Sequence, residues 1–384
     1  MKNIIIIGSK GYECNYGGWE TFVSNLINNY KDDDIRFFVP ELSFKMNSNI
    51  EIRNGVICKQ VFIPKHGYFT MFSFVIKALL YYTKLIRKER MKNVIIYMLG
   101  CRGGLIIPFI KKKLTRMGVK IITNPGSIDW KIESKPWIIR KLSKISEKKM
   151  INASNLVVCD SKMVENYIKE NYDVQTKYIP MGSRLNEVKD IDKKTRIFME
   201  KKNIRKREYY LVIGRFVPKN NIELIIKEFM LSDTKKDLVI VSDIEKNKYY
   251  DRLLKTTNFN KDKRIKFVGP IYDKDIITRL RVYAKANIYG HKEGGINPSL
   301  IENLSTTDIN IVYENEYNKE VGKESCIYFT DEAFMLRDIL DKVDNFKTRE
   351  YEEYGNKAKE RIKEEYNLDS IMNKYKKIFN NLLK

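Results

Sequence analysis

The chain has 384 residues, enough for two domains of ordinary size. Its 43% hydrophobic and 12% aromatic content is typical of folded globular domains and excludes a disordered or low-complexity protein. The net charge of +23 points to an anionic partner. The five scattered cysteines lack metal-type spacing, which indicates reduced thiols in a cytosolic protein. We expect no signal peptide, because the apolar run at residues 4–7 is short, and no run as long as a membrane-spanning helix.

The N-terminal half alternates predicted strands with predicted helices. Residues 3–7 form a continuous apolar run, as in buried parallel strands, and a glycine-rich segment follows. A helix is predicted from Trp19, where apolar residues recur with a 3.6-residue period. This alternation predicts a doubly wound α/β domain over residues 1–183. Its further strands are expected at 94–98, 120–123 and 155–159, with a helix at 137–152.

The pattern restarts after a polar stretch at residues 184–207, which we interpret as a linker. Residues 208–347 are predicted to form a second α/β domain, in which Asn221 caps a helix. Residues 348–384 are a charged helical tail, for which packing against the first domain is one expectation. Two Rossmann-like domains facing each other across a cleft make the GT-B architecture of the α/β class, in which ligands bind at strand carboxyl ends. The strands of the second domain are expected at 209–213, 238–241, 265–268, 286–289 and 309–313.

The most informative segment runs from Gly290 to Glu302. Its glycines let the backbone approach a ligand, and Asn297 with Pro298 suits a helix N-terminus, where free N–H groups attract anions. Glu302, about one turn into that helix, is placed to accept hydrogen bonds from hydroxyl groups. A phosphate-binding loop beside a hydroxyl-binding carboxylate favours an enzyme that uses a nucleotide sugar.

Positive charge is concentrated in residues 61–150, which carry 20 Lys and Arg against 4 Asp and Glu, a net charge of +16. Aromatic and aliphatic residues lie among these lysines, a combination that suits an anionic membrane surface. Core helices with solvated lysine faces are the alternative. Nucleic acid ranks lower, because no nucleic-acid-binding motif accompanies the charge. We therefore predict a cytoplasmic protein that binds the inner face of the cell membrane and no nucleic acid.

Three segments resemble, in order, the motifs of a bacterial rhamnosyltransferase group in glycosyltransferase family 4, with an N-terminal domain of the DUF1972 type. The resemblance implies the GT-B fold, no metal or other cofactor, and a retaining transfer of L-rhamnose from dTDP-β-L-rhamnose. The acceptor would be glucose or N-acetylglucosamine on undecaprenyl diphosphate. The product would carry a β-1,4 linkage in a capsular or cell-wall polysaccharide. The segments are Ile7 to Gly11 with Asn15 to Phe22, Gly214 to Asn221, and Gly290 to Glu302.

Donor-binding residues follow from these motifs. Arg215 is the first candidate to stabilise the leaving diphosphate. The family usually has lysine where Asn220 stands, so Lys219 either replaces it or is solvated. Of two family glutamates spaced eight apart, only Glu302 is kept, and backbone amides at residues 294–297 would contact the sugar instead. The predicted donor-binding residues are Gly17, Gly18, Arg215, Lys219, Asn220, His291, Gly294, Gly295, Asn297, Ser299 and Glu302.

Catalytic roles are assigned to residues that follow strands of the first domain. The segment Asn124 to Lys131 resembles the family's Asn-Val-Asp-Gly-Leu-Glu-Trp-Lys and keeps its second acid as Asp129. Asp129 is a candidate to bind the acceptor or take its proton, and Lys131 to contact a phosphate. Asp160 is either an acid of the cleft or an N-cap. The alternatives to the rhamnosyltransferase are another nucleotide-sugar donor and a non-catalytic polyanion-binding protein.

Overall fold

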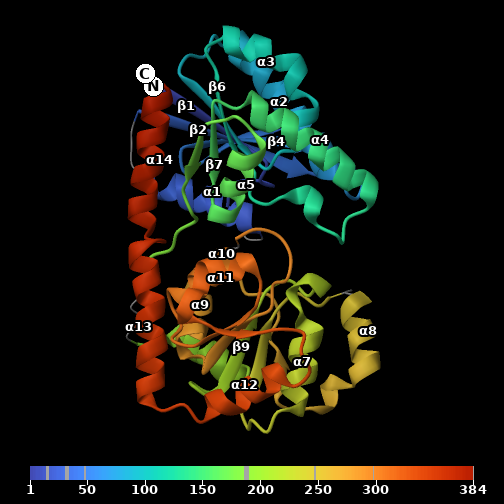
Figure 1. Ribbon diagram of the computed structural model, residues 1–384, viewed down its shortest axis with the longest axis vertical. Coiled ribbons are helices and arrows are strands. Elements are labelled where there is room, and N and C mark those ends of the chain that lie inside the picture. The colour runs from blue at the N-terminus through green and yellow to red at the C-terminus, as the bar shows by residue number, and fades with distance from the viewer. Residues whose placement is uncertain are drawn as a thin grey trace. The chain divides into compact units, whose positions relative to one another are not determined.

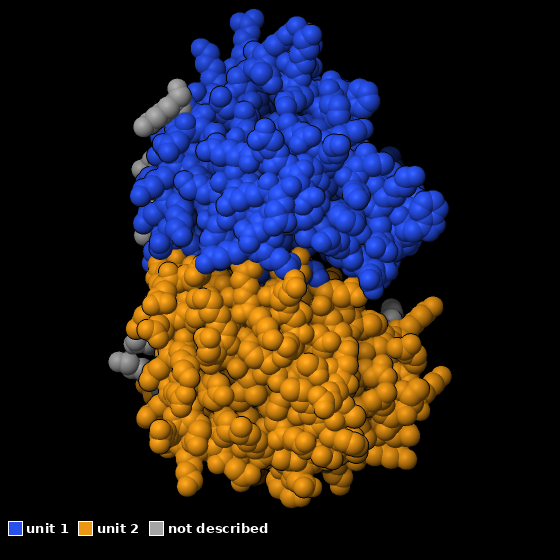
Figure 2. Space-filling model, in the orientation of Figure 1, with its two compact units in different colours: residues 1–181, 294–298, 368–384 blue, residues 182–293, 299–367 orange. Residues whose placement is uncertain are grey.

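The computed structural model describes residues 1–13, 17–30, 34–46, 49–185, 190–245, 248–296 and 298–383. The chain divides into two compact units, which Figure 1 shows as ribbons and Figure 2 as space-filling surfaces. Unit 1 contains residues 1–181, 294–298 and 368–384. Unit 2 contains residues 182–293 and 299–367. Each unit has a sheet and a hydrophobic core of its own.

Unit 1 is built on an eight-stranded sheet with the strand order β3-β4-β2-β1-β5-β6-β7-β8. Its neighbouring strands are parallel except for the antiparallel pair of β3 and β4. The central strand β5 is buried along its whole length, as a continuous apolar run predicts for a parallel sheet. The strands are β1 (Lys2–Ile7), β2 (Ile35–Ser43), β3 (Ile50–Arg53), β4 (Val56–Phe62), β5 (Val94–Leu99), β6 (Lys120–Asn124), β7 (Leu156–Cys159) and β8 (Thr176–Tyr178).

Helices cover the two faces of this sheet (Figure 1). Side chains alternate along each strand, so Ile96 and Met98 of β5 pack in the core beneath α2, α3 and α4. Tyr97 points the other way and contacts rings of α1 and α14. The helices are α1 (Gly18–Asn29), α2 (Phe69–Lys88), η1 (Arg102–Leu105), α3 (Ile107–Arg116), η2 (Asp129–Lys131), α4 (Trp137–Ala153), α5 (Lys162–Asn171) and α14 (Leu368–Leu382).

Helix α2 corrects one prediction from the sequence. By length and composition it is apolar enough to cross a membrane, although we expected no such run. Half of its most apolar window is buried, where Phe74, Val75 and Leu79 pack in the core of unit 1. This burial favours the core helix of a globular domain.

Unit 2 contains a six-stranded parallel sheet with the order β11-β10-β9-β12-β13-β14. Its strands are β9 (Tyr209–Ile213), β10 (Asp237–Val241), β11 (Ile265–Phe267), β12 (Ala286–Tyr289), β13 (Asn310–Tyr313) and β14 (Ile327–Phe329). Its helices are α6 (Lys193–Lys201), η3 (Pro218–Asn220), α7 (Ile222–Leu231), α8 (Lys248–Thr257), η4 (Phe259–Lys261), α9 (Lys274–Tyr283), α10 (Pro298–Leu304), α11 (Glu316–Gly322), η5 (Lys323–Ser325), α12 (Met335–Asp344) and α13 (Thr348–Glu364).

Two polar segments form helices that belong to the folded units, although their composition suggested a linker and a tail. The stretch interpreted as a linker, 184–207, contains α6, whose Met199 packs in the core of unit 2. The helical tail, 348–384, is divided, since α13 belongs to unit 2 and α14 to unit 1. Asn221 precedes α7 as predicted, but its φ of 56° is left-handed and its side chain makes no capping hydrogen bond.

Candidate functional site

Two loops that follow strands of unit 2 carry six of the predicted donor-binding residues, and the second of these loops passes into unit 1 at Gly294. Residues 214–221 follow β9, and residues 290–296 follow β12. These strands are adjacent and parallel, so both loops lie at the ligand-binding edge of the sheet. A side chain at Gly290 would place its Cβ 2.5 Å from the carbonyl oxygen of Asn220. The close approach of the two loops therefore requires a glycine there.

Asn220 holds the two loops together. Its Nδ2 donates to the carbonyl oxygen of Arg215 at 2.8 Å, and its Oδ1 lies 2.9 Å from Nδ1 of His291. The backbone N–H of Lys292 also donates to the carbonyl oxygen of Lys219 at 2.9 Å. Because both ends of the Asn220 amide are engaged, the geometry favours a positioning role over the direct donor contact that we predicted.

The same contact determines the tautomer of His291. Nδ2 of Asn220 must donate to a carbonyl oxygen, so its Oδ1 accepts and Nδ1 of His291 carries the proton. Burial and the charges of Lys219 and Arg215 lower the pKa of His291 to about 4. The ring is therefore neutral at pH 7, with Nε2 as an acceptor. This state suits a sugar hydroxyl better than a phosphate oxygen.

Arg215 is exposed beside this histidine. The next residue, Phe216, is buried and contacts the rings of Tyr249, Tyr250 and Phe267, which fixes the backbone of the loop. A solvent-facing guanidinium on a fixed backbone is well placed to bind an anionic group.

Glu302 has a partner that the sequence did not reveal. Arg281 of α9 is 5% exposed, and its Nη2 lies 2.7 Å from Oε2 of Glu302. The pair orients the Glu302 carboxylate, whose side chain is 33% exposed. The signal in the sequence was a charged residue on the apolar side of a helix, between Leu280 and Tyr283, which are both buried.

The remaining predicted residues of the second loop and of the helix that follows it are described by their backbone conformation and nearest neighbours. Gly294 has a φ of 107°, a conformation that favours glycine. Within unit 1, a Cβ at Gly295 would lie 2.2 Å from the carbonyl oxygen of Gly126. Oγ of Ser299 lies 3.5 Å from Nη2 of the arginine that pairs with Glu302. Helix α10 begins at Pro298 as predicted, while Asn297 lies outside the described residues.

The glycines predicted to approach a diphosphate in unit 1 have close protein neighbours instead. A Cβ at Gly17 would lie 2.0 Å from the carboxylate of Glu20. A Cβ at Gly18 would lie 3.3 Å from Pro298, which belongs to the same unit. Glu20 is itself buried and accepts a hydrogen bond from the backbone of Lys10 at 2.7 Å. Packing against Glu20 and Pro298 is one reason for glycine at these positions, and their contact with a diphosphate stays a prediction.

Asp160 directly follows β7 and is 1% exposed. The alternative role as an N-cap is wrong, because Ser161 caps α5 with its own side chain, which accepts from the backbone of Val164 at 3.4 Å. Burial raises the pKa of Tyr97, and the nearby charge of Asp160 adds to that increase. The hydroxyl of Tyr97 lies 3.0 Å from that of Tyr375 in α14. Asp160 therefore lies near two buried tyrosines.

Asp129 is held in ion pairs. Its Oδ2 lies 3.2 Å from Arg102 and 3.3 Å from Lys135, and Ser127 donates to its Oδ1 at 3.0 Å. Burial favours the neutral acid, but the two cations outweigh it and hold the pKa of Asp129 below its ordinary value. A carboxylate stabilised in its charged form is a weak proton acceptor. The geometry thus favours a positioning role for Asp129 over that of a base.

Glu147 of α4 is a buried acid that sequence reasoning missed. Its Oε1 accepts hydrogen bonds from Tyr167 at 2.6 Å, Tyr172 at 2.8 Å and the indole of Trp130 at 3.3 Å. Burial raises the pKa of Glu147 in spite of these bonds. The ammonium group of Lys131 lies over the rings of Trp130 and Tyr167. The sequence carries no signal for this residue, because a glutamate in a lysine-rich helix is expected on the solvated face.

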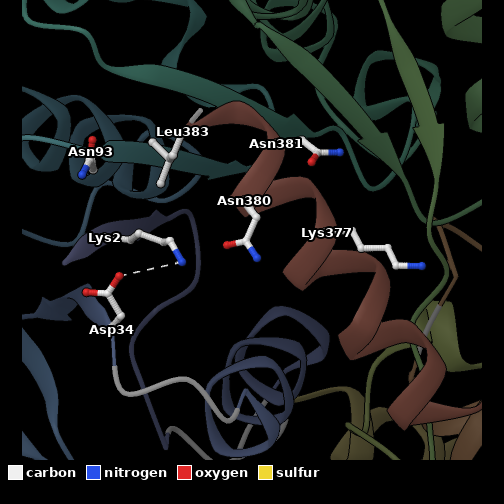
Figure 3. Close-up of a pocket in the computed structure, with 7 residues that line it drawn as sticks. All are labelled: Lys2, Asp34, Asn93, Lys377, Asn380, Asn381 and Leu383. Carbon is white, nitrogen blue, oxygen red and sulfur yellow. Dashed lines mark ion pairs between the residues drawn. The ribbon is translucent and has the colours of Figure 1, made fainter.

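A surface hollow of about 370 Å³ lies elsewhere in unit 1 (Figure 3). The start of β1 and the end of α14 form it, at the opposite end of β1 from the glycine-rich segment. Lys2 and Asp34 form a long ion pair there at 4.0 Å. No predicted site residue is among those that line it, which are Lys2, Asp34, Asn93, Lys377, Asn380, Asn381 and Leu383.

That the reaction needs no metal ion or other cofactor stays a prediction.

Comparisons with known proteins now bear on the fold. A family described as a domain of unknown function, DUF1972, matches residues 1–184, as the N-terminal motif predicted. An uncharacterized glycosyltransferase of Methanocaldococcus jannaschii is 26% identical over the whole of both chains. The solved sucrose-phosphate synthase of Thermosynechococcus elongatus covers 100% of this chain and 99% of its own, with a TM-score of 0.81 and 16% identity.

Anabaena HepE in complex with UDP covers 99% of this chain and 100% of its own, with a TM-score of 0.73 and 11% identity. The chain has the GT-B fold. The predicted GT-B architecture is confirmed, and the comparisons support a glycosyltransferase. The donor sugar, the acceptor and the linkage made by this GT-B protein stay predictions.

Proposed function

We propose that this GT-B protein is a retaining rhamnosyltransferase of capsular or cell-wall polysaccharide synthesis. It transfers L-rhamnose from dTDP-β-L-rhamnose to glucose or N-acetylglucosamine on undecaprenyl diphosphate and forms a β-1,4 linkage. The observation that supports sugar transfer is that exposed Arg215 lies beside neutral His291 at the carboxyl ends of β9 and β12. Glu302, oriented by Arg281, lies in the helix that follows the same loop. The choice of rhamnose and of the lipid acceptor rests on the motif resemblance.

The proposed reaction exchanges one bond at C1 of the donor sugar for another. The bond from C1 to the diphosphate oxygen breaks, and the acceptor oxygen bonds to C1 on the same face. Arg215, with Lys219 as the second cation, stabilises the charge on the leaving diphosphate. The acceptor proton passes to the leaving phosphate oxygen, so the step needs no protein base. Nε2 of His291 accepts a hydrogen bond from the donor sugar, and Glu302 binds the ribose.

A transferase for a UDP-sugar is the second candidate. The HepE structure contains UDP, and HepE shares the fold of this chain. The two candidates share the reaction class and differ in the shape of the pocket for the base and the sugar.

A transfer assay tests the proposal. Purified full-length protein is incubated in EDTA with dTDP-β-L-rhamnose or UDP-glucose and two synthetic lipid diphosphates, bearing glucose or N-acetylglucosamine. A mass gain of one deoxyhexose with the first donor supports the proposal, its acceptor and its metal independence together. A hexose gained from UDP-glucose favours the second candidate. No product from a folded protein with either donor favours a non-catalytic polyanion-binding role.

We also propose that unit 1 binds the anionic inner face of the cell membrane. Phe109 of α3 is 80% exposed, and Lys112 and Lys113 follow it by one helical turn on the same face. Trp137 of α4 is 69% exposed, and Lys141 lies one turn further along that helix. Exposed aromatic rings among lysines suit the interface between lipid headgroups and acyl chains.

A further inference from the structure

The loop between β6 and α4, residues 125–136, is held by hydrogen bonds in addition to the ion pairs of Asp129. The backbone N–H of Gly126 donates to Oδ1 of Asn124 at 2.9 Å. The indole of Trp130 donates to Glu147, and Nε of Arg140 donates to the carbonyl oxygen of Trp130 at 2.9 Å. These bonds fix both the start and the middle of the loop. Nζ of Lys135 adds a longer contact, at 3.4 Å, to the carbonyl oxygen of Asp129. The start and the middle of the loop therefore keep hydrogen bonds that involve neither Arg102 nor Lys135.

Arg102 and Lys135 converge on a single oxygen of Asp129. Since their nitrogens lie 3.2 and 3.3 Å from Oδ2, they are no more than 6.5 Å apart. Both distances exceed the roughly 2.7–2.9 Å of a strong charge-assisted hydrogen bond, so one carboxylate serves two cations loosely. The side chains of Arg102 and Lys135 are 25% and 19% exposed. They are partly desolvated, yet solvent still reaches them.

This pair lies where a doubly wound sheet binds ligands. Arg102 begins η1 soon after the end of β5, and Lys135 lies in the loop that follows β6. Strands β5 and β6 are adjacent and parallel, so both cations lie at the carboxyl edge of the unit 1 sheet. Further positive charge comes from Lys131 and Lys144, whose ammonium groups lie over the Trp130 ring.

We infer that Arg102 and Lys135 form a binding site for a phosphate group of the acceptor, with Asp129 as the spacer that holds the two cations in place. A planar guanidinium beside an ammonium group matches the oxygens of a diphosphate. The inference rests on the proposed function, in which the acceptor sugar is attached to a lipid diphosphate. The headgroup of a membrane lipid is the other source of the same chemistry.

Calorimetric titration with inorganic pyrophosphate tests the site without turnover. Full-length protein is used, with saturating dTDP to fill the donor site. The double variant Arg102→Gln/Lys135→Gln should bind pyrophosphate about tenfold more weakly or worse, whereas wild type binds one equivalent. A matched control, Arg36→Gln/Lys177→Gln, removes the same charges from exposed positions of unit 1 and should bind like wild type. Equal weakening in both double variants, or no binding to wild type, overturns the inference.

Two further probes identify the source of the phosphate. With the lipid-diphosphate acceptor, the Arg102→Gln/Lys135→Gln variant should raise the acceptor KM about tenfold or more. Its donor KM and its rate with the same sugar on an uncharged alkyl chain should stay unchanged. Vesicles of phosphatidylglycerol and phosphatidylcholine should bind this variant as well as they bind the Arg36→Gln/Lys177→Gln control. Vesicle binding lost in this variant alone would assign the site to a lipid headgroup and overturn its assignment to the acceptor.

The outcomes separate this site from the proposed reaction. If no sugar is transferred but pyrophosphate binding depends on Arg102 and Lys135, the reaction fails and the phosphate site stands. If transfer occurs but neither pyrophosphate affinity nor acceptor KM depends on them, the site fails alone. Thermal unfolding completes the test, since the loop is held by Glu147, Arg140 and Asn124. A lowered midpoint with unchanged pyrophosphate affinity means that the ion pairs are only structural.

Discussion

Arg281 changes what a substitution at Glu302 measures. Because Arg281 is 5% exposed, removing the carboxylate leaves a nearly buried cation without its partner, which destabilises the fold. Glu302→Ala therefore mixes a loss of substrate contacts with a loss of stability. Glu302→Gln keeps an oxygen acceptor and is the cleaner probe of ribose binding.

Arg215 offers a test at a residue without that complication. Its side chain is exposed, so Arg215→Ala should leave the melting temperature unchanged. It should lower kcat/KM for sugar transfer about 100-fold, because one cation that stabilises the leaving diphosphate is lost. Steady-state kinetics and thermal unfolding of the same preparation measure both. Near-normal turnover would remove Arg215 from the donor site.

The lowered pKa of His291 predicts that the protein becomes less stable as the pH falls. In the unfolded chain its pKa is about 6.5, whereas the fold lowers the pKa of His291 to about 4. The unfolded state therefore binds the proton first. The contribution of neutral His291 to the free energy of unfolding is therefore fully present above about pH 6.5 and is lost as the pH falls toward 4. It amounts to about 3 kcal/mol at most.

The measurement is urea unfolding of wild type and His291→Gln at several pH values from 4.5 to 8. The free energy of unfolding of wild type should fall more steeply below about pH 6.5 than that of the variant. Above about pH 7 the two should run in parallel. Parallel curves over the whole range would show that burial does not shift the histidine.

Asp129→Asn distinguishes a positioning role from that of a base. The amide can still accept from Ser127 but no longer attracts Arg102 and Lys135. We expect KM for the diphosphate acceptor to change severalfold, with kcat within about threefold of wild type. Loss of a general base would instead lower kcat about 100-fold or more for every acceptor. Kinetics with charged and uncharged acceptors separate the two results.

The sequence predicted the placement of site residues better than their partners. Gly214 to Asn221 and Gly290 to Glu302 follow β9 and β12, because strand and loop signals are local. Asn220 and His291 are 71 residues apart, and Arg281 meets Glu302 only through the fold. Pairings of this kind decide protonation states and roles, and no local pattern encodes them.

At the level of elements, α14 completes the core of unit 1. Phe379 is fully buried and contacts the rings of Tyr30, Tyr97 and Tyr375. Composition obscured this role, because the tail alternates apolar residues with many charges. Helix α6 was hidden in the same way within a stretch that reads as a linker, since only Thr195 and Met199 are buried in it.

Truncating Phe379 tests the contribution of this helix. Phe379→Ala should lower the free energy of unfolding by about 3–5 kcal/mol, because it leaves a cavity among aromatic rings. Lys374→Ala on the same helix is the control, since that side chain is exposed and its loss should cost less than about 0.5 kcal/mol. Urea denaturation measures both. Similar small effects in the two variants would mean that α14 contributes little to the core.

For the whole molecule, charge and exposed aromatic rings predict how it meets a membrane. Binding to phosphatidylglycerol vesicles should weaken strongly as salt rises from about 0.1 to 1 M, because screening shortens the reach of the positive charge from about 10 to 3 Å. Phe109→Ser/Trp137→Ser should reduce the binding that persists at high salt, while Leu231→Ser in unit 2 should not. Cosedimentation measures all three. Salt-independent binding would contradict an electrostatic contribution.

The division of unit 1 along the chain has a consequence for biosynthesis. A ribosome synthesises residues 1–181 before unit 2, and the whole of unit 2 before the helix that covers Phe22, Tyr30 and Tyr97. Until that helix emerges, the nascent protein presents an uncovered aromatic surface to its surroundings. Chaperones that recognise such surfaces therefore have a long opportunity to bind before α14 is translated.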